Sequence, residues 1–140
     1  MVSFEEQKST LRTPRKTCFV TMTSGGEPAW RFHYFYGDGV CKVDDFFALR
    51  EVPKRTAAKE LDFLMYCFEK HATAQRIRAP GVLTNKAFAR FLYARGWSVA
   101  RKNKSAYEVE KDLVKDKVPA PSVMGGNWRK KRLAARRAIR

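Results

Sequence analysis

The segment LTNKAFARFLYARGWSVARKNKSAYEVE, residues 83–110, carries the strongest structural signals in the chain. Its large apolar side chains recur at the spacing of one helix face: Phe88, Phe91 and Leu92. Thr84 before them is a good N-cap residue, and Gly96 after them is a good residue for ending a helix. Two segments with alternating apolar residues follow, at 97–99 and 107–109. This order predicts a helix and then a β-hairpin.

The second half of that hairpin has an alternative interpretation. Ser105 and Glu108 form a capping box, which is typical of a helix start. The alternation of Tyr107 and Val109 favours a strand instead. We favour the hairpin, and residues 105–116 stay open between strand and helix.

Positive charge is concentrated in two blocks. Between Gly81 and Lys104 there are six Lys or Arg residues and no Asp or Glu, and residues 128–140 add seven cations and no acid. These blocks supply most of the net charge of +15 carried by the 140 residues. A surface that serves solubility alone mixes the two signs. The segregation therefore indicates a polyanionic partner, and nucleic acid is the partner that such basic blocks typically bind.

The sequence disfavours a membrane as that polyanion. No apolar run approaches the ~18–20 residues of a membrane span. Leu133 and Ile139 give the last basic block too little apolar surface for an interfacial helix. Three cysteines without CxxC spacing suit a reducing compartment, and the first residues show neither a secretory signal nor an evident transit peptide. We therefore expect an intracellular protein of the cytoplasm, the nucleus or a virion.

The N-terminal half predicts a β-meander. Residues 17–23 and 29–36 are rich in β-branched and aromatic side chains and are separated by turn residues, which indicates a hairpin. A third short strand is expected at 40–43, after a second turn. Asp44 or Asp45 then fits as the cap of a short helical turn.

A long helix is expected from Pro53 to about Arg76. Proline is tolerated in the first turn of a helix, and the apolar residues that follow keep helical spacing: Ala57, Leu61, Leu64, Met65, Phe68 and Ala72. Four charged residues fall away from this stripe: Lys59, Asp62, Glu69 and Lys70.

These elements define the expected domain organisation and fold class. Residues 1–16 form a polar and basic arm, 17–117 a single domain, 118–127 a Pro/Gly linker and 128–140 a basic C-terminal arm. The domain is expected to be α+β, with an N-terminal hairpin or meander packed on the long helix. Its winged-helix-like part, a helix plus a hairpin, would span about residues 54–110.

Part of the chain resembles a known module. The pieces TNKAFARFLYARGW and VARKNKSAYEV, within residues 61–109, are similar to the small winged-helix module at the C-terminus of viral and phage-type primase–helicases. The resemblance covers about a third of the chain and does not extend to the ATPase or primase portions of those proteins. It implies a nucleic-acid-binding module whose helix enters the major groove and whose hairpin loop touches the backbone. It implies neither polymerase nor helicase activity.

The expected contact residues are mostly cations that would meet the phosphate backbone, which positions a protein without reading sequence. The main surface comprises Lys86, Arg90, Tyr93, Arg101, Lys102, Asn103 and Lys104. The C-terminal arm adds Arg129, Lys130, Lys131, Arg132, Arg136 and Arg137, and the N-terminal arm adds Arg12, Arg15 and Lys16. We therefore expect binding with little sequence specificity.

Catalytic and metal-binding signatures are weak in this sequence. It has no P-loop, GxSxG or HExxH motif, so we expect no catalytic residue and no cofactor. A zinc set of Cys18, Cys41, Cys67 and His71 is conceivable, but its spacing is not that of a zinc knuckle, and we expect no metal. The two histidines, His33 and His71, are expected in core or surface roles.

The sequence thus predicts a non-catalytic nucleic-acid-binding protein, of DNA or RNA, that is a structural or accessory part of a larger nucleoprotein assembly. Its partners would be nucleic acid and other proteins of the assembly, with no membrane and no small-molecule substrate. One alternative is a ribosomal or RNA-particle protein that contacts RNA through its arms. Another is a protein-interaction or virion scaffold module that binds acidic protein surfaces. A metal-dependent nuclease is the least favoured alternative.

Overall fold

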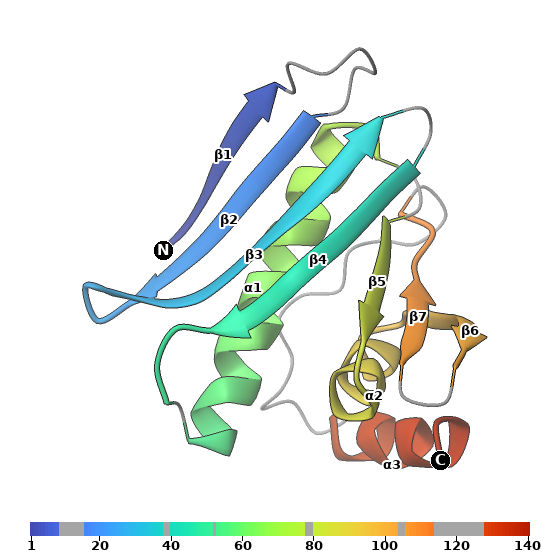
Figure 1. Cartoon of the computed structure of the whole chain (residues 1–140). Helices are drawn as coiled ribbons and strands as arrows, with labels where there is room; N and C mark the ends of the chain where they lie inside the picture. The colour runs from blue at the N-terminus through green and yellow to red at the C-terminus, as the bar shows by residue number, and fades with distance from the viewer. Residues whose placement is uncertain (9–15, 38–39, 52, 78–79, 104–105, 114–127) are drawn as a thin grey trace.

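A computed structural model describes most of the chain: residues 1–8, 16–37, 40–51, 53–77, 80–103, 106–113 and 128–140. Within these ranges the chain forms one seven-stranded sheet and three helices (Figure 1). The strand order across the sheet is β1-β2-β3-β4-β5-β7-β6, so the predicted α+β class is confirmed.

The N-terminal half is a meander of four antiparallel strands. These are β1 (Val2–Lys8), β2 (Lys16–Ser24), β3 (Glu27–Gly37) and β4 (Val40–Ala48). Gly25 and Gly26 connect β2 to β3 with φ values of 63° and 83°, a left-handed conformation that glycine adopts without strain. The hairpin predicted here is therefore confirmed.

Two details of the meander differ from the sequence prediction. The first residues, expected as a polar arm, form the edge strand β1, because Val2 and Phe4 alternate and pack against the core. The backbone from Asp44 to Ala48 continues strand β4, so the helical turn predicted after Asp44 is wrong. Pairing of this segment with β3 holds it extended.

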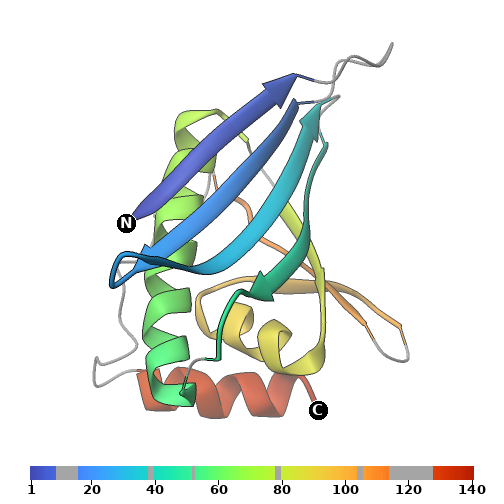
Figure 2. The same cartoon turned by 60° about the vertical axis from the view of Figure 1, so that its left-hand side comes forward.

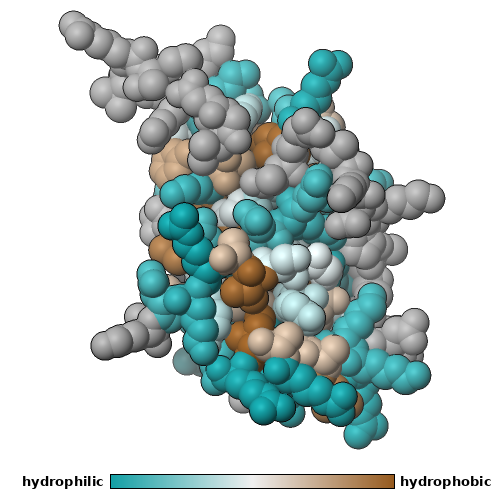
Figure 3. All heavy atoms as spheres, turned by 90° about the vertical axis from the view of Figure 1, so that its right-hand side faces the viewer, coloured by the Kyte–Doolittle hydropathy of each residue, from teal (hydrophilic) through white to brown (hydrophobic). Residues whose placement is uncertain are grey.

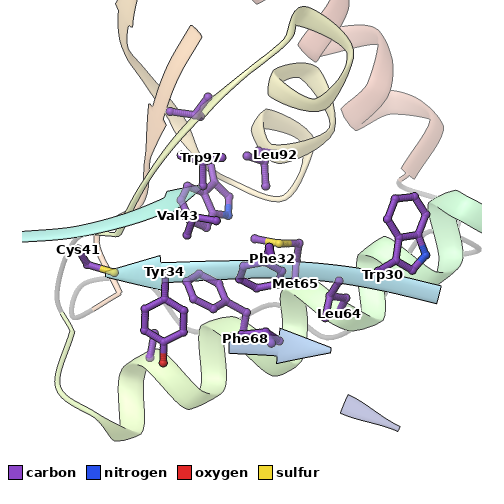
Figure 4. Packing of buried hydrophobic residues seen from close by; sticks show 14 of the residues in the cluster. Trp30, Phe32, Tyr34, Cys41, Val43, Leu64, Met65, Phe68, Leu92 and Trp97 are labelled. Atoms are coloured by element: carbon purple, nitrogen blue, oxygen red, sulfur yellow. The ribbon is translucent and has the colours of Figure 1, made fainter. Parts of the chain in front are cut away.

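Helix α1 (Lys54–Ala74) confirms the long helix that the apolar stripe predicts. It lies across one face of the meander, as Figures 1 and 2 both show. The ring of Phe68 meets Phe32 and Tyr34 of β3 edge-on, with centroids 5.4 and 5.2 Å apart. Figure 4 shows these rings at the centre of the core, with Leu64 and Met65 of α1 beside them. Burial of these side chains fixes which face of the meander α1 covers.

The C-terminal half continues the same sheet. It contains β5 (Pro80–Thr84), α2 (Lys86–Ala94), β6 (Ser98–Lys102) and β7 (Tyr107–Glu110). The helix-plus-hairpin prediction is confirmed locally, with Asn85 in place of Thr84 as the N-cap of α2. Residues 107–110 form a strand, which settles the open choice for that segment.

The winged helix predicted for residues 54–110 is not what the structure shows. Strand β7 lies between β5 and β6, so the hairpin extends the large sheet. Strand β5 also runs parallel to β4, with α1 as the crossover between them. Sequence patterns in 80–84 are too short to reveal this strand, and its pairing partners are distant along the chain.

Helix α3 (Trp128–Ala138) packs on α2. Trp128, Ala135 and the following Ile139 are buried, and the Trp128 ring meets Phe91 of α2 edge-on at 5.6 Å. Residues 128–140, expected as a basic arm, thus form a docked helix with its cations outward. The linker predicted at 118–127 lies outside the described residues. None of the described helices is long and apolar enough to cross a membrane.

Candidate functional site

The parallel strands β4 and β5 separate from one another after a short stretch of pairing. Their pairs are Cys41 with Pro80, Lys42 with Gly81, and Val43 with Val82. Beyond these pairs β4 continues to Ala48 and β5 to Thr84, and Figure 1 shows the two strands moving apart. Leu83, in the diverging part of β5, is 65% exposed. Backbone N–H and C=O groups at such an opening can bond to a ligand.

A helix begins after each of the two diverging strands. Helix α1 starts after Pro53, which supplies no side-chain cap, and its first turn contains no acid. Helix α2 starts after Asn85, whose side chain accepts from the Phe88 amide at 2.9 Å, and its first turn also lacks an acid. The first amides of a helix attract anions, most strongly where no side chain caps them. The start of α1 is therefore the better anion-binding position of the two.

The connection from β4 to α1 is held by Glu60 of α1. Its carboxylate accepts from Trp30 Nε1 of β3 at 2.6 Å and pairs with Arg50 Nη2 at 3.2 Å. Glu60 is 7% exposed, so these bonds form largely out of water. They fix the start of α1 relative to the end of β4.

A second buried group of charges joins α1 to α2. The Arg95 guanidinium, at the end of α2, pairs with Asp62 and with Glu69 of α1. Glu69 also accepts from Trp97 Nε1 at 2.9 Å and from Lys111 Nζ at 3.2 Å. All four charged side chains are less than 5% exposed, so Asp62 and Glu69 are buried although they lie off the apolar stripe of α1. This network sets the relative placement of the helices that flank the β4–β5 opening.

The face of the meander opposite α1 carries an aromatic group that includes a histidine. His33 on β3 lies 5.7 Å from the Phe19 ring and 4.8 Å from the Phe35 ring. Strand alternation turns these side chains away from the face that Trp30, Phe32 and Tyr34 present to α1. His33 is directly opposite Asp44, the first residue of β4 beyond its pairing with β5. His33 is thus on β3, the strand next to β4, and β4 borders the opening.

Helix α2 does not present its predicted basic face freely to solvent. Lys86 is exposed, but Arg90 is half-buried and its Nε donates to the Ile139 carbonyl at 2.7 Å. Tyr93 is also half-buried and packs against the cluster formed with Trp128 of α3. Helix α3 therefore covers part of the surface that the sequence assigned to a ligand.

The other predicted contact residues are scattered over the surface. Arg101, Lys102 and Asn103 are exposed on and after β6, and Lys16 is exposed at the start of β2. The exposed cations of α3 are Arg129, Lys130, Lys131, Arg132, Arg136 and Arg137. Lys104, Arg12 and Arg15 lie outside the described residues. Among the described residues, Lys16 and the cations of α3 thus lie on different surfaces of the molecule.

The residues of the conceivable zinc set are dispersed. Cys18 and Cys41 are buried on β2 and β4, which are separated by β3, and burial raises the pKa of the Cys41 thiol to about 12. His71 stacks on Phe4 with ring centroids 4.0 Å apart. Within the part of the chain that the structure describes, no three His, Cys, Asp or Glu residues could hold a metal ion together.

Sequence comparisons find no relative of this chain. No family model matches it, and no curated protein matches it in sequence.

Solved structures, by contrast, share its architecture. The crystal structure of an aminoglycoside 6'-acetyltransferase type Ii matches with a TM-score of 0.59 at 10% identity, over 72% of each chain. The PaiA N-acetyltransferase of Thermoplasma acidophilum, solved with coenzyme A, matches with a TM-score of 0.58 at 15% identity, over 69% of this chain and 60% of that one. The N-acetyltransferase PseH of Campylobacter jejuni, solved with acetyl coenzyme A, matches at 0.51 and 9% identity, over 70% and 67%.

The chain has the GNAT fold of these N-acetyltransferases. This finding corrects the resemblance to primase–helicase winged helices, which is wrong. It also overturns the predictions of a non-catalytic nucleic-acid-binding protein and of partners that exclude a small molecule, because the structures that share the fold are those of acetyltransferases. The predicted basic helix and hairpin are present, but they belong to a seven-stranded sheet with the GNAT fold and do not form a winged helix.

Sequence reasoning missed the residues that define the opening. Strand β5 gave no clear signal, because its five residues include a proline and a glycine. The alternation of side chains along β3 puts His33 on the face opposite Trp30 and Phe32. Nothing local to His33 indicates that β4 and β5 diverge beside it, since that depends on a pairing between segments about 40 residues apart.

Proposed function

We propose that the chain is an acyl-CoA-dependent N-acyltransferase that acts on a small amine. The observation that carries the proposal is the parting of β4 and β5 beside the uncapped start of α1, within a fold shared with N-acetyltransferases. Two of the compared structures contain coenzyme A or acetyl coenzyme A. At 15% identity or less this likeness concerns fold, so the activity itself rests on the arrangement of this chain's own residues.

The charge of this region suits the phosphates of acyl-CoA. The first turn of α1 offers amides without a side-chain cap, and the exposed Arg55 lies in that turn. Lys86 is exposed in the first turn of α2. Helix amides combined with Arg or Lys are a common way to hold a pyrophosphate. The start of α1 would therefore hold the pyrophosphate, and the thioester would extend between β4 and β5.

The reaction needs groups that orient the thioester and accept a proton. Acyl-CoA supplies the thioester, whose C–S bond breaks as the new amide C–N bond forms. Backbone N–H groups on the diverging edges of β4 and β5 would orient the acyl carbonyl and stabilise the charge that develops on its oxygen. His33 is placed to take the proton that the amine loses, and the departing thiolate regains a proton.

The proposal is tested by measuring thiol release from acetyl-CoA with a panel of small primary amines. We expect amine-dependent thiol release by the wild-type protein. His33→Gln should lower kcat at least ~100-fold, since general base catalysis contributes about 10²–10⁴. The matched control is His71→Gln, because His71 packs between α1 and β1 on the other face of the meander.

Two results would count against this function. Thiol release that is absent with every amine and every acyl chain length would reject the acyltransferase. Equal kcat for His33→Gln and His71→Gln would reject His33 as the proton acceptor while leaving the acyltransferase in place.

A further inference from the structure

Helix α3 presents a cationic face that the buried charge networks do not use. Its exposed side chains include six Lys or Arg, the exposed Arg140 follows the helix, and residues 128–140 contain no acid. The ion pairs within the fold include those of Arg50, Arg95 and Lys111 with carboxylates of α1. Figure 3 shows hydrophilic side chains along the lower edge of the molecule, at the level where Figure 1 places α3. The exposed cations of α3 are therefore accessible to an anionic ligand.

The orientation of α3 is fixed by its apolar side. Trp128, Ala135 and Ile139 are at most 8% exposed and hold the helix against α2 and the core. At its C-terminal end, the Ile139 carbonyl accepts from Arg90 of α2 at 2.7 Å. The cations are therefore directed outward by a docked helix, and their position is set by the fold.

The C-terminal end of α3 lies next to α2. Figures 1 and 2 both show the C-terminus beside α2. Lys86 begins α2, and Lys102 ends β6 with its Nζ 5.7 Å from the centre of the Tyr107 ring. Tyr107 pairs with Thr84, the last residue of β5. Lys86 and Lys102 thus lie at the end of β5 that borders the proposed site, and the C-terminal end of α3 lies beside α2.

We propose that this basic corner, made of Lys86, Lys102, Arg136, Arg137 and Arg140, binds the 3′-phosphate of coenzyme A. The inference rests on the proposed acyl-CoA-dependent function. A phosphate monoester carries nearly two negative charges and three acceptor oxygens, and Arg forks bind such a group with paired hydrogen bonds. Helix α3 would then be the element that selects the phosphorylated end of acyl-CoA, separate from the site of acyl transfer.

Like charges within the corner support a bound anion. Arg136 of the corner lies four residues after Arg132 on α3. Such pairs repel along a helix surface, and an anion between them relieves the repulsion. Cations near a helix C-terminus also interact favourably with the helix dipole, which is a purely structural role. A role in anion binding predicts that removing these cations lowers the affinity for the ligand, whereas a purely structural role predicts an unchanged affinity.

The test compares coenzyme A with dephospho-coenzyme A, which lacks the 3′-phosphate, by titration calorimetry. We expect the wild-type protein to bind coenzyme A at least ~10-fold more tightly. The double variant Arg136→Gln/Arg137→Gln should lose that preference and bind dephospho-coenzyme A as the wild type does. The matched control is Arg129→Gln/Lys130→Gln, which removes the same charge from the other end of α3, about 10 Å away. It should keep the preference.

Each remaining outcome has a definite meaning. Equal binding of the two compounds by the wild-type protein overturns the basic corner and leaves the acyltransferase proposal standing. If both double variants lose the preference for coenzyme A equally, the basic corner is overturned as well, because the preference then depends on the net charge of the protein and not on the position of the cations. Failure of the wild type to bind either compound overturns the proposed function and the corner together. Circular dichroism of each variant shows whether α3 remains folded.

Discussion

Arg95 is the residue through which α1 and α2 are joined, because its guanidinium lies between two carboxylates of α1. Arg95→Met would take this cation away from the buried Asp62 and Glu69. Removing one partner from a buried ion network costs about 3–5 kcal/mol. We expect the free energy of unfolding in urea to fall by that amount.

Arg90→Met is the matched control for this prediction. It makes the same substitution in the same helix, but Arg90 is half-buried and gives one hydrogen bond to the Ile139 carbonyl. Its loss should cost about 1 kcal/mol. Equal destabilisation by the two variants would show that the network around Arg95 has no special part in joining the helices.

His71 should make the stability of the fold sensitive to acid. Burial lowers its pKa from the ordinary value of 6.5, and Glu6 opposes this shift in part. Below that value the unfolded chain takes up a proton that the folded chain resists, so the free energy of unfolding should fall as pH drops from about 7 to about 5. His71→Phe removes this group and keeps an aromatic ring to stack on Phe4.

The measurement is the free energy of unfolding of both proteins at the two pH values. Its wild-type value should fall more steeply than that of His71→Phe, because other groups titrate equally in both. Parallel pH dependences would mean that His71 is as easily protonated in the folded protein as in the unfolded one.

At the scale of elements, α3 depends on Trp128 for its docking. The Trp128 ring is 8% exposed and packs edge-on against Phe91. Trp128→Ala should remove about 3 kcal/mol of packing free energy. Hydrogen exchange of the α3 amides should then accelerate more than ~100-fold, while the amides of β2 and β3 stay protected.

Leu133→Ala provides the comparison on the same helix, because Leu133 is 47% exposed. It should leave exchange in α3 unchanged. Acceleration of exchange throughout the sheet in Trp128→Ala would mean that α3 and the sheet unfold as one unit.

Elements with a strong local pattern could be predicted from the sequence, and those defined by distant partners could not. Helix α1 and the β6–β7 hairpin follow from apolar spacing within a few turns or strands. Strand β1 looks like a polar arm because its glutamates face solvent along an edge, and its pairing with β2 is invisible locally. The insertion of β7 between β5 and β6 is likewise a long-range arrangement.

The same limit applies to the charged residues of the site. Asp62 and Glu69 lie off the apolar stripe of α1, and their burial follows from Arg95 and Lys111, which are far away in sequence. A helical pattern alone cannot supply such partners. Their roles therefore become visible with the tertiary structure.

At the scale of the whole molecule, the net charge of +15 indicates an anionic ligand without identifying it. Nucleic acid and coenzyme A both carry phosphates, and a count of cations does not distinguish a polymer from a small molecule. The proposed function makes that distinction, because in it the opening between β4 and β5, beside the start of α1, would hold a small ligand. The net charge thus indicates an anionic partner, and the proposed function assigns a small one.

The most direct test of this account is titration calorimetry of the wild-type protein with acetyl-CoA at low ionic strength. We predict saturable binding of one acetyl-CoA per chain, weakened when Arg55→Glu reverses the charge in the first turn of α1. Absence of binding up to millimolar acetyl-CoA, with the chain shown to be folded, would contradict the account.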